Sequence, residues 1–301
     1  MSDQRIAQPG LTDQFGRRID YVRLSVTDRC DLRCSYCMPE GFKGFEEPDH
    51  WLNFDEIEHL IGAFARLGVR RIRLTGGEPL LRRNIVELAG RIAALPGIDD
   101  LSLSTNATQL DKHARALKAA GVTRLNVSLD SLQQARVEKI NGRDVLARVM
   151  AGLAAAQDAG FDPIKLNMVA LRGTNDDEID EMVAYCMEHG FVLRLIEAMP
   201  MGSTGRNVEY MDLQPVKERL RAQFNLIDTT YAGAGPARYL AQRYGAIVTF
   251  KVVLLAGLVV AGWLHRRYVF VGTPMQRRHF LVVGIDVRDD DVVIDPRFCG
   301  P

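Results

Sequence analysis

Hydrophobic and polar residues follow two different periods along the chain from Tyr21 to Met199. Short runs with a period of two predict strands, and longer stretches with apolar residues three or four positions apart predict helices. The predicted strands are Tyr21–Val26, Arg70–Leu74, Asp100–Ser104, Arg124–Ser128, Ile164–Met168 and Phe191–Ile196. The predicted helices are one with Phe54, Ile57, Ile61 and Phe64 on a single face, then Asn84–Ala94, Asp111–Ala119, Asp144–Asp158 and Asp176–Glu188. Asn53 and Glu56 predict a capping box at the start of the first helix.

Strands that alternate with helices predict an α/β fold built from parallel βαβ units. A barrel, a partial barrel and an open doubly wound sheet all fit this order. Parallel strands that are buried on both faces are usually continuous apolar runs, but here polar residues recur on one face. The polar pairs are Arg23 with Ser25, Arg71 with Arg73, Ser102 with Ser104, Asn126 with Ser128, and Lys165 with Asn167. Buried charges need partners, so we favour a barrel whose polar lumen holds a charged ligand over strands that are edge-exposed or internally hydrogen-bonded.

Composition excludes several classes of function. The chain has 301 residues, enough for one large α/β domain with a smaller appendage or for two domains. Lys plus Arg and Asp plus Glu each number 38, so no overall basic field attracts nucleic acid and no acidic excess indicates disorder. The cysteines number five, an odd number, whereas a secreted disulfide framework usually pairs an even set. Residues 1–10 lack the apolar core of a signal peptide. We therefore expect a cytoplasmic enzyme with reduced thiols.

Three of the cysteines stand in one short loop after the first predicted strand. The sequence Cys30-Asp-Leu-Arg-Cys34-Ser-Tyr-Cys37 has the spacing CxxxCxxC. Three thiolates hold three irons of a [4Fe–4S] cluster and leave the fourth iron open to a small molecule. A structural zinc site needs four ligands, usually as two pairs, and no second pair lies nearby. A disulfide would leave one thiol over, so the cluster is the favoured interpretation.

A glycine-rich turn follows the second predicted strand. In Thr75-Gly76-Gly77-Glu78-Pro79, two glycines let the backbone come close to a ligand and the proline stiffens the turn. Such a turn is a weak signal on its own, but one βα unit after CxxxCxxC it resembles the radical S-adenosylmethionine (SAM) superfamily. In that family SAM chelates the open iron, the turn contacts the SAM amino group, and one electron from the cluster cleaves SAM to methionine and a 5′-deoxyadenosyl radical.

The resemblance narrows to the GTP 3′,8-cyclase family over Tyr21–Met199. It is carried by Arg23-Leu-Ser-Val-Thr-Asp-Arg-Cys30, Tyr36-Cys-Met-Pro39, Ile72-Arg-Leu-Thr-Gly-Gly-Glu-Pro79, Leu125-Asn-Val-Ser-Leu-Asp130, Lys165-Leu-Asn167, Ile196-Glu-Ala-Met-Pro200 and Gly235-Pro-Ala-Arg-Tyr239. It implies a partial TIM-type (β/α)6 barrel. It also implies a lyase that converts GTP to (8S)-3′,8-cyclo-7,8-dihydroguanosine 5′-triphosphate, the first step of molybdenum cofactor biosynthesis.

The same resemblance implies roles for individual residues. Those assigned to SAM are Tyr36, which stands near the adenine, and Gly77, Ser128 and Met199. Those assigned to GTP are Arg23, Arg73, Ser104 and Lys165, with Ser104 in place of the usual threonine. The three basic residues belong to the polar strand faces, and converging cations suit a triphosphate. The alternative is that each pairs with a nearby carboxylate such as Glu197 or Asp130. Arg194 serves either SAM or a salt bridge.

The family pattern stops near Tyr244. The family carries a second cluster near its C-terminus, held by a CxxC pair and a later cysteine, whereas this sequence has only Cys299 after Tyr239. We therefore expect one cluster, ligated by three cysteines. SAM binding should survive, while the guanine end of GTP loses its metal anchor. The predicted division is a radical SAM core, residues 1–235, and a short irregular C-terminal appendage, residues 236–301.

The appendage allows several interpretations. Residues 246–264 are apolar except for Thr249 and Lys251, just long enough to span a bilayer, with His265-Arg-Arg267 as a positive flank. The charge of Lys251 argues against a membrane span, and a buried hairpin is the alternative. A further strand pair, Phe280–Val287 and Asp291–Ile294, is predicted around the Asp289-Asp290 turn. A shifted reading frame would also produce such a tail.

Three hypotheses of function follow. The first is a GTP 3′,8-cyclase that uses GTP and an electron donor and forms a homodimer, as members of the family often do. The second is a radical SAM enzyme for another substrate, such as a peptide, against which the basic lumen argues. The third is a non-catalytic paralogue that folds but does not turn over, because the second cluster is missing.

Overall fold

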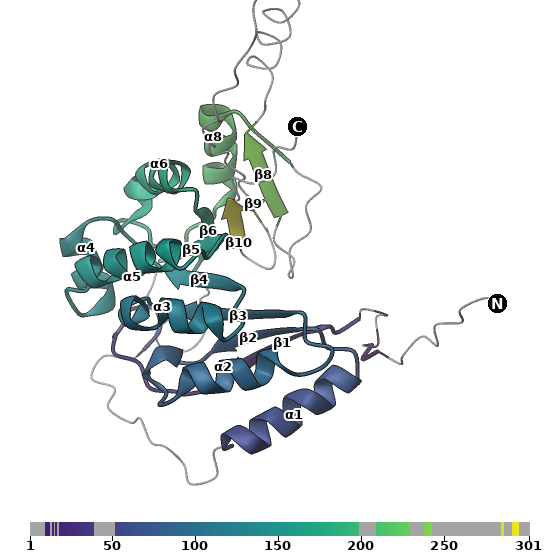
Figure 1. Cartoon of the computed structure of the whole chain (residues 1–301). Coiled ribbons are helices and arrows are strands. Elements are labelled where there is room, and N and C mark those ends of the chain that lie inside the picture. Colours follow the sequence, from purple (N-terminus) through teal and green to yellow (C-terminus); the bar gives the residue numbers. More distant parts are fainter. Residues whose placement is uncertain are drawn as a thin grey trace, which may run out of the picture.

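Six parallel strands in chain order form the centre of the fold (Figure 1). The computed structural model describes residues 10–12, 14, 16, 18–38, 52–198, 209–228, 238–242, 284–285 and 291–294. The strands are β1 (Tyr21–Ser25), β2 (Arg71–Thr75), β3 (Asp100–Thr105), β4 (Arg124–Ser128), β5 (Ile164–Ala170) and β6 (Val192–Glu197). All six strands predicted between Tyr21 and Met199 are present, with ends that differ by at most two residues.

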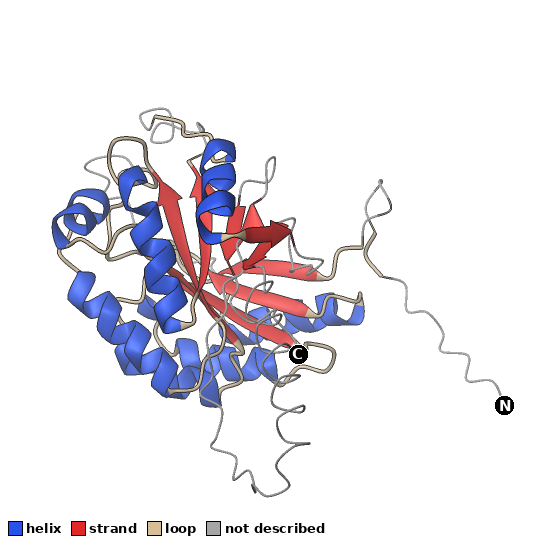
Figure 2. Ribbon diagram, turned by 90° about the horizontal axis from the view of Figure 1, so that it is seen from above, coloured by secondary structure: helices blue, strands red, loops and turns tan. Residues whose placement is uncertain are grey.

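Helices cover one face of this curved sheet (Figure 2). The predicted helices are confirmed as α1 (Phe54–Arg66), α2 (Ile85–Ala93), α3 (Leu110–Ala119), α5 (Leu146–Asp158) and α6 (Ile179–His189). The capping box is also confirmed: Glu56 N donates to Asn53 Oδ1 at 3.0 Å, and Asn53 N donates to Glu56 Oε2 at 2.8 Å. The first turn of the predicted helix Asp176–Glu188 is the short 3-10 turn η2 (Asp176–Glu178). Helical elements that were not predicted are the 3-10 turn η1 (Pro79–Leu81) and the helices α4 (Gln134–Asn141) and α8 (Gln214–Phe224).

The two faces of the sheet differ as their period of two predicts. Apolar strand residues such as Ile72, Leu74 and Leu103 are fully buried beneath the helices. The polar residues lie on the other face, which we call the concave face. Register aligns them across the strands: Arg23 neighbours Arg73. The α/β fold and the partial barrel with a polar inner face are therefore confirmed.

Strands from the C-terminal part extend the same sheet. They are β7 (Leu226–Asp228), β8 (Arg238–Gln242), β9 (Gly284–Ile285) and β10 (Asp291–Ile294). Strand β10 runs antiparallel to β6 and parallel to β8, which pairs with β7. The antiparallel pairing of β9 with β10 matches the predicted strand pair. The domain division after residue 235 stays a prediction.

Some sequence predictions fall outside the described residues. They are Met199, Cys299, residues 229–237 and the apolar stretch 246–264. Among the helices that the structure describes, none is long and apolar enough to cross a bilayer.

Candidate functional site

The three clustered cysteines lie in the loop that leaves the C-terminal end of β1. Cys30 and Cys34 are half-buried, and Cys37 is exposed. The carbonyl oxygen of Cys34 accepts hydrogen bonds from Cys37 N at 2.9 Å and Met38 N at 3.1 Å, so the chain turns back on itself here. The backbone N–H of Leu32 donates to Cys30 Sγ at 3.4 Å. All cysteines in the described residues are free, so three thiols remain available as ligands.

The two glycines after β2 pack directly against this loop. A Cβ atom on Gly76 would lie 2.3 Å from the carbonyl oxygen of Thr27, and one on Gly77 would lie 2.3 Å from that of Arg29. Gly77 N donates to Thr27 O at 2.7 Å, and Glu78 N donates to Arg29 O at 2.7 Å. The glycines are therefore needed because the loop backbone comes so close, a reason that the sequence did not reveal. The role of Gly77 toward SAM stays a prediction.

Glu78 joins the ends of β2 and β3 from a buried position. Its Oε1 accepts hydrogen bonds from Leu80 N at 3.0 Å and Thr105 Oγ1 at 2.7 Å, and its Oε2 accepts one from Asn106 N at 2.6 Å. Burial raises the pKa of Glu78 to about 7, although these hydrogen bonds act in the opposite direction. The carboxyl group is thus occupied within the protein.

Asn106 links the hydrogen bonds of Glu78 to the cysteine loop. Its Nδ2 donates to Asp31 Oδ1 at 2.8 Å and lies 3.9 Å from Cys30 Sγ. Thr108 Oγ1 donates to the second carboxylate oxygen of Asp31 at 2.6 Å. Asp31 directly follows Cys30. The hydrogen bonds from Glu78 to Asn106 and from Asn106 to Asp31 therefore fix the first cysteine to the end of β3.

The pKa of Glu78 makes stability depend on pH. Glutamate ordinarily has a pKa of 4.5, and in the folded protein Glu78 has a pKa of about 7. Between these values the folded state binds the proton more tightly, so the stabilisation is fully present below pH 4.5 and is lost as the pH rises through 7. We expect the free energy of unfolding of the metal-free protein to fall by up to about 3 kcal/mol over this interval.

Urea unfolding at pH 5, 6, 7 and 8 measures this fall. A Glu78→Gln variant, which cannot ionise, is expected to show a flatter profile over the same interval. Glu87→Gln is the matched control, because Glu87 is an exposed glutamate on α2. Equal slopes for the parent and Glu78→Gln would contradict the assignment.

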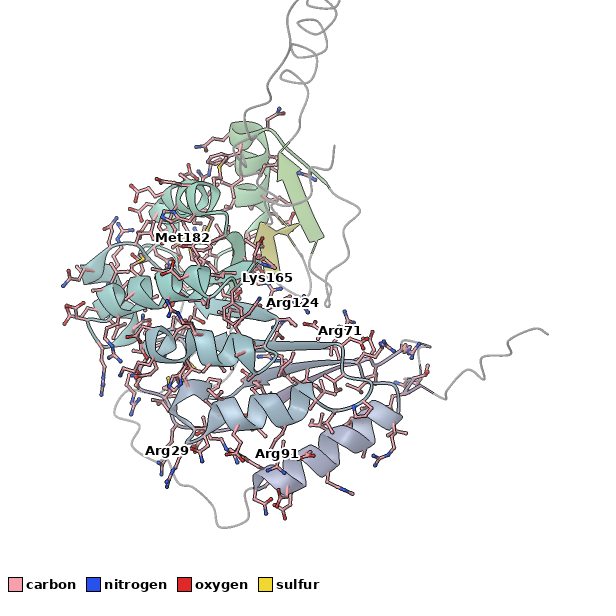
Figure 3. The ribbon with its side chains drawn as sticks, viewed as in Figure 1. Arg29, Arg71, Arg91, Arg124, Lys165 and Met182 are labelled. Atoms are coloured by element: carbon pink, nitrogen blue, oxygen red, sulfur yellow. The ribbon has the colours of Figure 1, made fainter. Side chains whose placement is uncertain are left out.

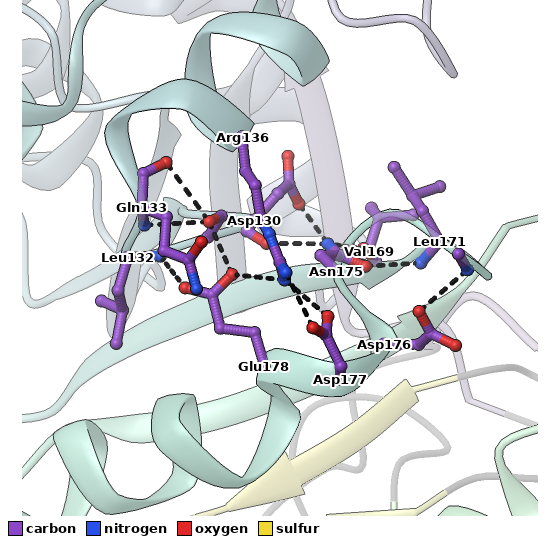
Figure 4. Close-up of polar contacts among 12 residues, drawn as sticks. Asp130, Leu132, Gln133, Arg136, Val169, Leu171, Asn175, Asp176, Asp177 and Glu178 are labelled. Carbon is purple, nitrogen blue, oxygen red and sulfur yellow. Dashed lines mark hydrogen bonds and ion pairs between the residues drawn. The ribbon is translucent and has the colours of Figure 1, made fainter.

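Tyr36, between the second and third cysteines, is anchored to Asp130. Its hydroxyl donates to Asp130 Oδ2 at 2.8 Å, and Val169 N donates to Asp130 Oδ1 at 2.9 Å. Burial raises the pKa of Asp130 to about 6. Asn175 Nδ2 donates to the carbonyl oxygens of Asp130 and Val169 at 2.7 and 2.9 Å (Figure 4). The aromatic ring is thereby tied to the ends of β4 and β5.

These thiols fit an iron–sulfur cluster. Burial raises the pKa of Cys30, Cys34 and Cys37, so the free protein holds neutral thiols whose protons iron would displace. Within the described residues, no three His, Cys, Asp or Glu side chains converge closely enough to hold a single metal ion. A [4Fe–4S] cluster does not require three ligands to converge on one ion, because each of its three thiolates binds a different iron.

Arginine side chains gather on the concave face. Arg73 is half-buried, with its guanidinium carbon 5.4 Å from the centre of the Tyr21 ring. Its Nε is buried and finds no hydrogen-bond partner among the described residues. Burial lowers the pKa of Arg73 to about 10, against the opposing effect of Tyr21. The charges of Arg194, Arg23 and Arg124 lower it further. Cations placed close together in this way favour the binding of an anion.

Ion pairs explain two of the basic residues on this face. Arg71 Nη2 lies 2.5 Å from Asp20 Oδ1, and Arg124 forms an ion pair with Asp100. Figure 3 shows Arg71, Arg124 and the buried Lys165 along the side of the sheet away from the helices. Structural ion pairs thus account for Arg71 and Arg124, whereas the predicted alternative of such pairs concerned Arg23, Arg73 and Lys165.

The carboxylates that were predicted as alternative partners are engaged elsewhere. Glu197 accepts hydrogen bonds from Tyr210 Oη at 2.9 Å and from Leu213 N at 2.8 Å. Asp130 accepts those of Tyr36 and Val169.

The other predicted site residues divide between two places. Tyr36, Gly77 and Ser128 lie with the cysteines at the C-terminal ends of the strands, where ligands of open α/β sheets bind. Arg23, Arg73, Ser104 and Lys165 lie on the concave face. Their roles toward SAM and GTP stay predictions.

Sequence reasoning missed the supporting residues around the cysteines. Asp31 and Asn106 were given no role, and Asp130 was named only as a possible ion-pair partner. Asp31 follows Cys30 directly, Asn106 follows β3 directly, and Asp130 lies two residues after β4. Their positions in the sequence could have indicated this role, because polar residues at the carboxyl ends of parallel strands meet at one edge of the sheet.

Comparisons with known proteins agree with this geometry. Residues 24–186, more than half of the chain, match the Radical SAM superfamily. The GTP 3′,8-cyclase of Pseudomonas putida (strain GB-1) is 47% identical over 232 residues, which cover 76% of this chain and 69% of that protein. The GTP 3′,8-cyclase of Erythrobacter litoralis (strain HTCC2594) is 45% identical over 240 residues, which cover 78% of this chain and 71% of that protein.

Solved structures share the fold. Streptococcus suis SuiB bound to S-adenosylmethionine superposes with a TM-score of 0.58 at 17% identity, covering 68% of this chain and 48% of that chain. TYW1 with a bound lysine-pyruvate adduct gives a TM-score of 0.52 at 14% identity, covering 71% of this chain and 76% of that chain. The chain therefore belongs to the radical SAM superfamily and, within it, to the GTP 3′,8-cyclase family.

Proposed function

We propose that the protein is a GTP 3′,8-cyclase, which converts GTP to (8S)-3′,8-cyclo-7,8-dihydroguanosine 5′-triphosphate in the first step of molybdenum cofactor biosynthesis. The observation that carries this proposal is the half-buried Arg73, surrounded by further cations on the concave face. A triphosphate would bind its Nε, which finds no hydrogen-bond partner among the described residues, and would balance the charges of Arg73 and the neighbouring Arg23. A neutral peptide would do neither, which argues against the second hypothesis.

The chain's own residues would divide the work between two regions. Cys30, Cys34 and Cys37 would hold a [4Fe–4S] cluster, and Tyr36 would pack against SAM. When bound, the cluster and SAM supply a carbon radical by one-electron cleavage, with the electron coming from an external donor. Arg23 and Arg73 would bind the phosphates and so orient the ribose toward the strand ends. The need for reduced thiols accords with the cytoplasmic location expected from the sequence.

The decisive experiment measures the formation of 5′-deoxyadenosine. Anaerobically reconstituted protein, reduced with dithionite, is expected to cleave SAM much faster with GTP than without a nucleotide. Conversion of GTP itself, followed by chromatography of the nucleotide products, separates an active cyclase from a non-catalytic paralogue. SAM cleavage that is indifferent to GTP would contradict the substrate assignment.

Removing the charge of Arg73 is expected to weaken GTP binding. A charge-assisted hydrogen bond contributes about 1.5 to 3 kcal/mol, so Arg73→Leu should lower the affinity for GTP by about 10- to 100-fold. Equilibrium dialysis with GTP measures this. The matched control is Arg91→Leu, because Arg91 lies on the helical side, 2.6 Å from Glu58 (Figure 3). Equal affinities for both variants would remove Arg73 from the site.

A further inference from the structure

Helix α4 ends against the cysteine loop. A helix leaves its last carbonyl groups without partners inside the helix, and here the loop supplies them. Arg33 N donates to Asn141 O at 2.8 Å, and Ser35 N donates to Ile140 O at 2.9 Å. The residues before and after Cys34 are thus both hydrogen-bonded to the end of α4, which fixes the second cysteine relative to this helix.

The side chain of Asn141 continues this contact to the sulfur itself. Asn141 is only 7% exposed, and its Oδ1 lies 3.4 Å from Cys34 Sγ, which donates as a neutral thiol. The chain leaves the helix at Gly142 with φ +71°, where an added Cβ would lie 3.2 Å from the Cβ of Arg33. Backbone contacts on both sides therefore hold the carboxamide beside the sulfur.

When iron binds, the contact between Asn141 and Cys34 can no longer be a hydrogen bond donated by the sulfur. A thiolate ligand has no proton to donate, whereas the carboxamide of asparagine carries both an acceptor and an N–H donor. Rotation of the amide by half a turn presents Nδ2–H to the sulfur, and the two orientations occupy the same space. Hydrogen bonds to ligand sulfurs are among the features that set the reduction potential of such clusters.

We propose that Asn141 is a positioning residue that donates an N–H hydrogen bond to the Cys34 thiolate and thereby raises the reduction potential of the cluster. The reduced cluster carries one more negative charge, so a donor at its ligand sulfur stabilises it more than the oxidised form. Asn106, the other amide near a cysteine, is 3.9 Å from Cys30 Sγ and already donates to Asp31. The proposal rests on the cluster and not on the substrate, so its failure would leave the GTP assignment standing.

The test is a redox titration with dithionite, followed by electron paramagnetic resonance of the reduced cluster, in the full-length reconstituted protein. Asn141→Leu removes the donor, and Asn141→Asp replaces it by a group of the same shape that carries a negative charge. Both variants are expected to keep about four irons per chain and to need a lower potential for reduction, with the larger shift for Asn141→Asp. Lys139→Ala, an exposed change on the same helix, should leave the potential unchanged.

The remaining outcomes are unambiguous. Potentials equal to that of the parent in iron-loaded variants would overturn the proposal, because a merely structural contact would not move the potential. If Asn141→Leu loses its iron, Asn141→Asp decides, since it keeps the volume and the backbone. Loss of iron in both variants would assign Asn141 to holding the loop alone and would equally overturn the proposal.

Discussion

Replacing Cys34 by alanine is expected to lower the iron content from about four per chain to nearly none. Each thiolate binds one iron, so with two thiolates left the cluster has two open irons and is not retained. The formation of 5′-deoxyadenosine should then fall by about a thousandfold or more, as when one essential member of a catalytic unit is removed. Iron analysis and product chromatography after anaerobic reconstitution measure both effects. Cys30→Ala and Cys37→Ala should behave alike.

The chain contains its own matched control for this experiment. Cys186 lies fully buried on α6, within the hydrophobic core. Cys186→Ala should cost about 1 kcal/mol of stability and leave the iron content unchanged. An equal loss of iron in this variant would show that general unfolding, and not ligation, governs the result. About eight irons in the parent protein would contradict the expectation of a single cluster.

Gly77→Ala is expected to prevent cluster assembly without touching a ligand. The added methyl would lie 2.3 Å from Arg29 O and 2.5 Å from Asp28 O, distances at which the backbone must move. Because Cys30 follows Arg29 directly, this displacement moves the first thiol. We expect about 3 kcal/mol of destabilisation from overpacking and a severe loss of iron, with a circular dichroism spectrum that still shows the α/β fold.

Gly62→Ala is the control for this variant. Gly62 lies within α1, and an added Cβ would meet its nearest atoms at 3.6 and 3.8 Å, an ordinary contact. Alanine is the better helix former by up to about 1 kcal/mol, so stability should be unchanged or slightly increased. Full iron loading in Gly77→Ala would show that the loop tolerates the displacement and would contradict the explanation given for this glycine.

The sequence predicted the sheet well because its information is local. An alternation of period two assigns each strand residue to one face, so Arg73 and Ile72 were placed on opposite sides without knowledge of the neighbouring strands. The capping box of α1 is similarly local, since Asn53 and Glu56 are three positions apart. The cysteine spacing is also a local pattern, which is why the sequence indicates the cluster loop without knowledge of the fold.

Long-range contacts explain what the sequence could not predict. The need for Gly77 arises from a backbone about fifty positions earlier, where spacing along the chain gives no hint. The ion pair of Arg71 with Asp20 also joins residues that are far apart in the sequence, because parallel strands bring the two together. Helix α4 was missed for a different reason: it is short and mostly polar, and only Val137, Ile140 and Asn141 are buried.

The pairing of β10 with the outer edge of β6 has a consequence for biosynthesis. Translation runs from the N-terminus, so β6 leaves the ribosome well before residues 291–294 have been made. During that interval the peptide groups along this edge face solvent, the arrangement through which strands of different molecules associate. A neighbouring nascent chain would therefore meet, in that interval, the same edge of β6 that β10 later occupies.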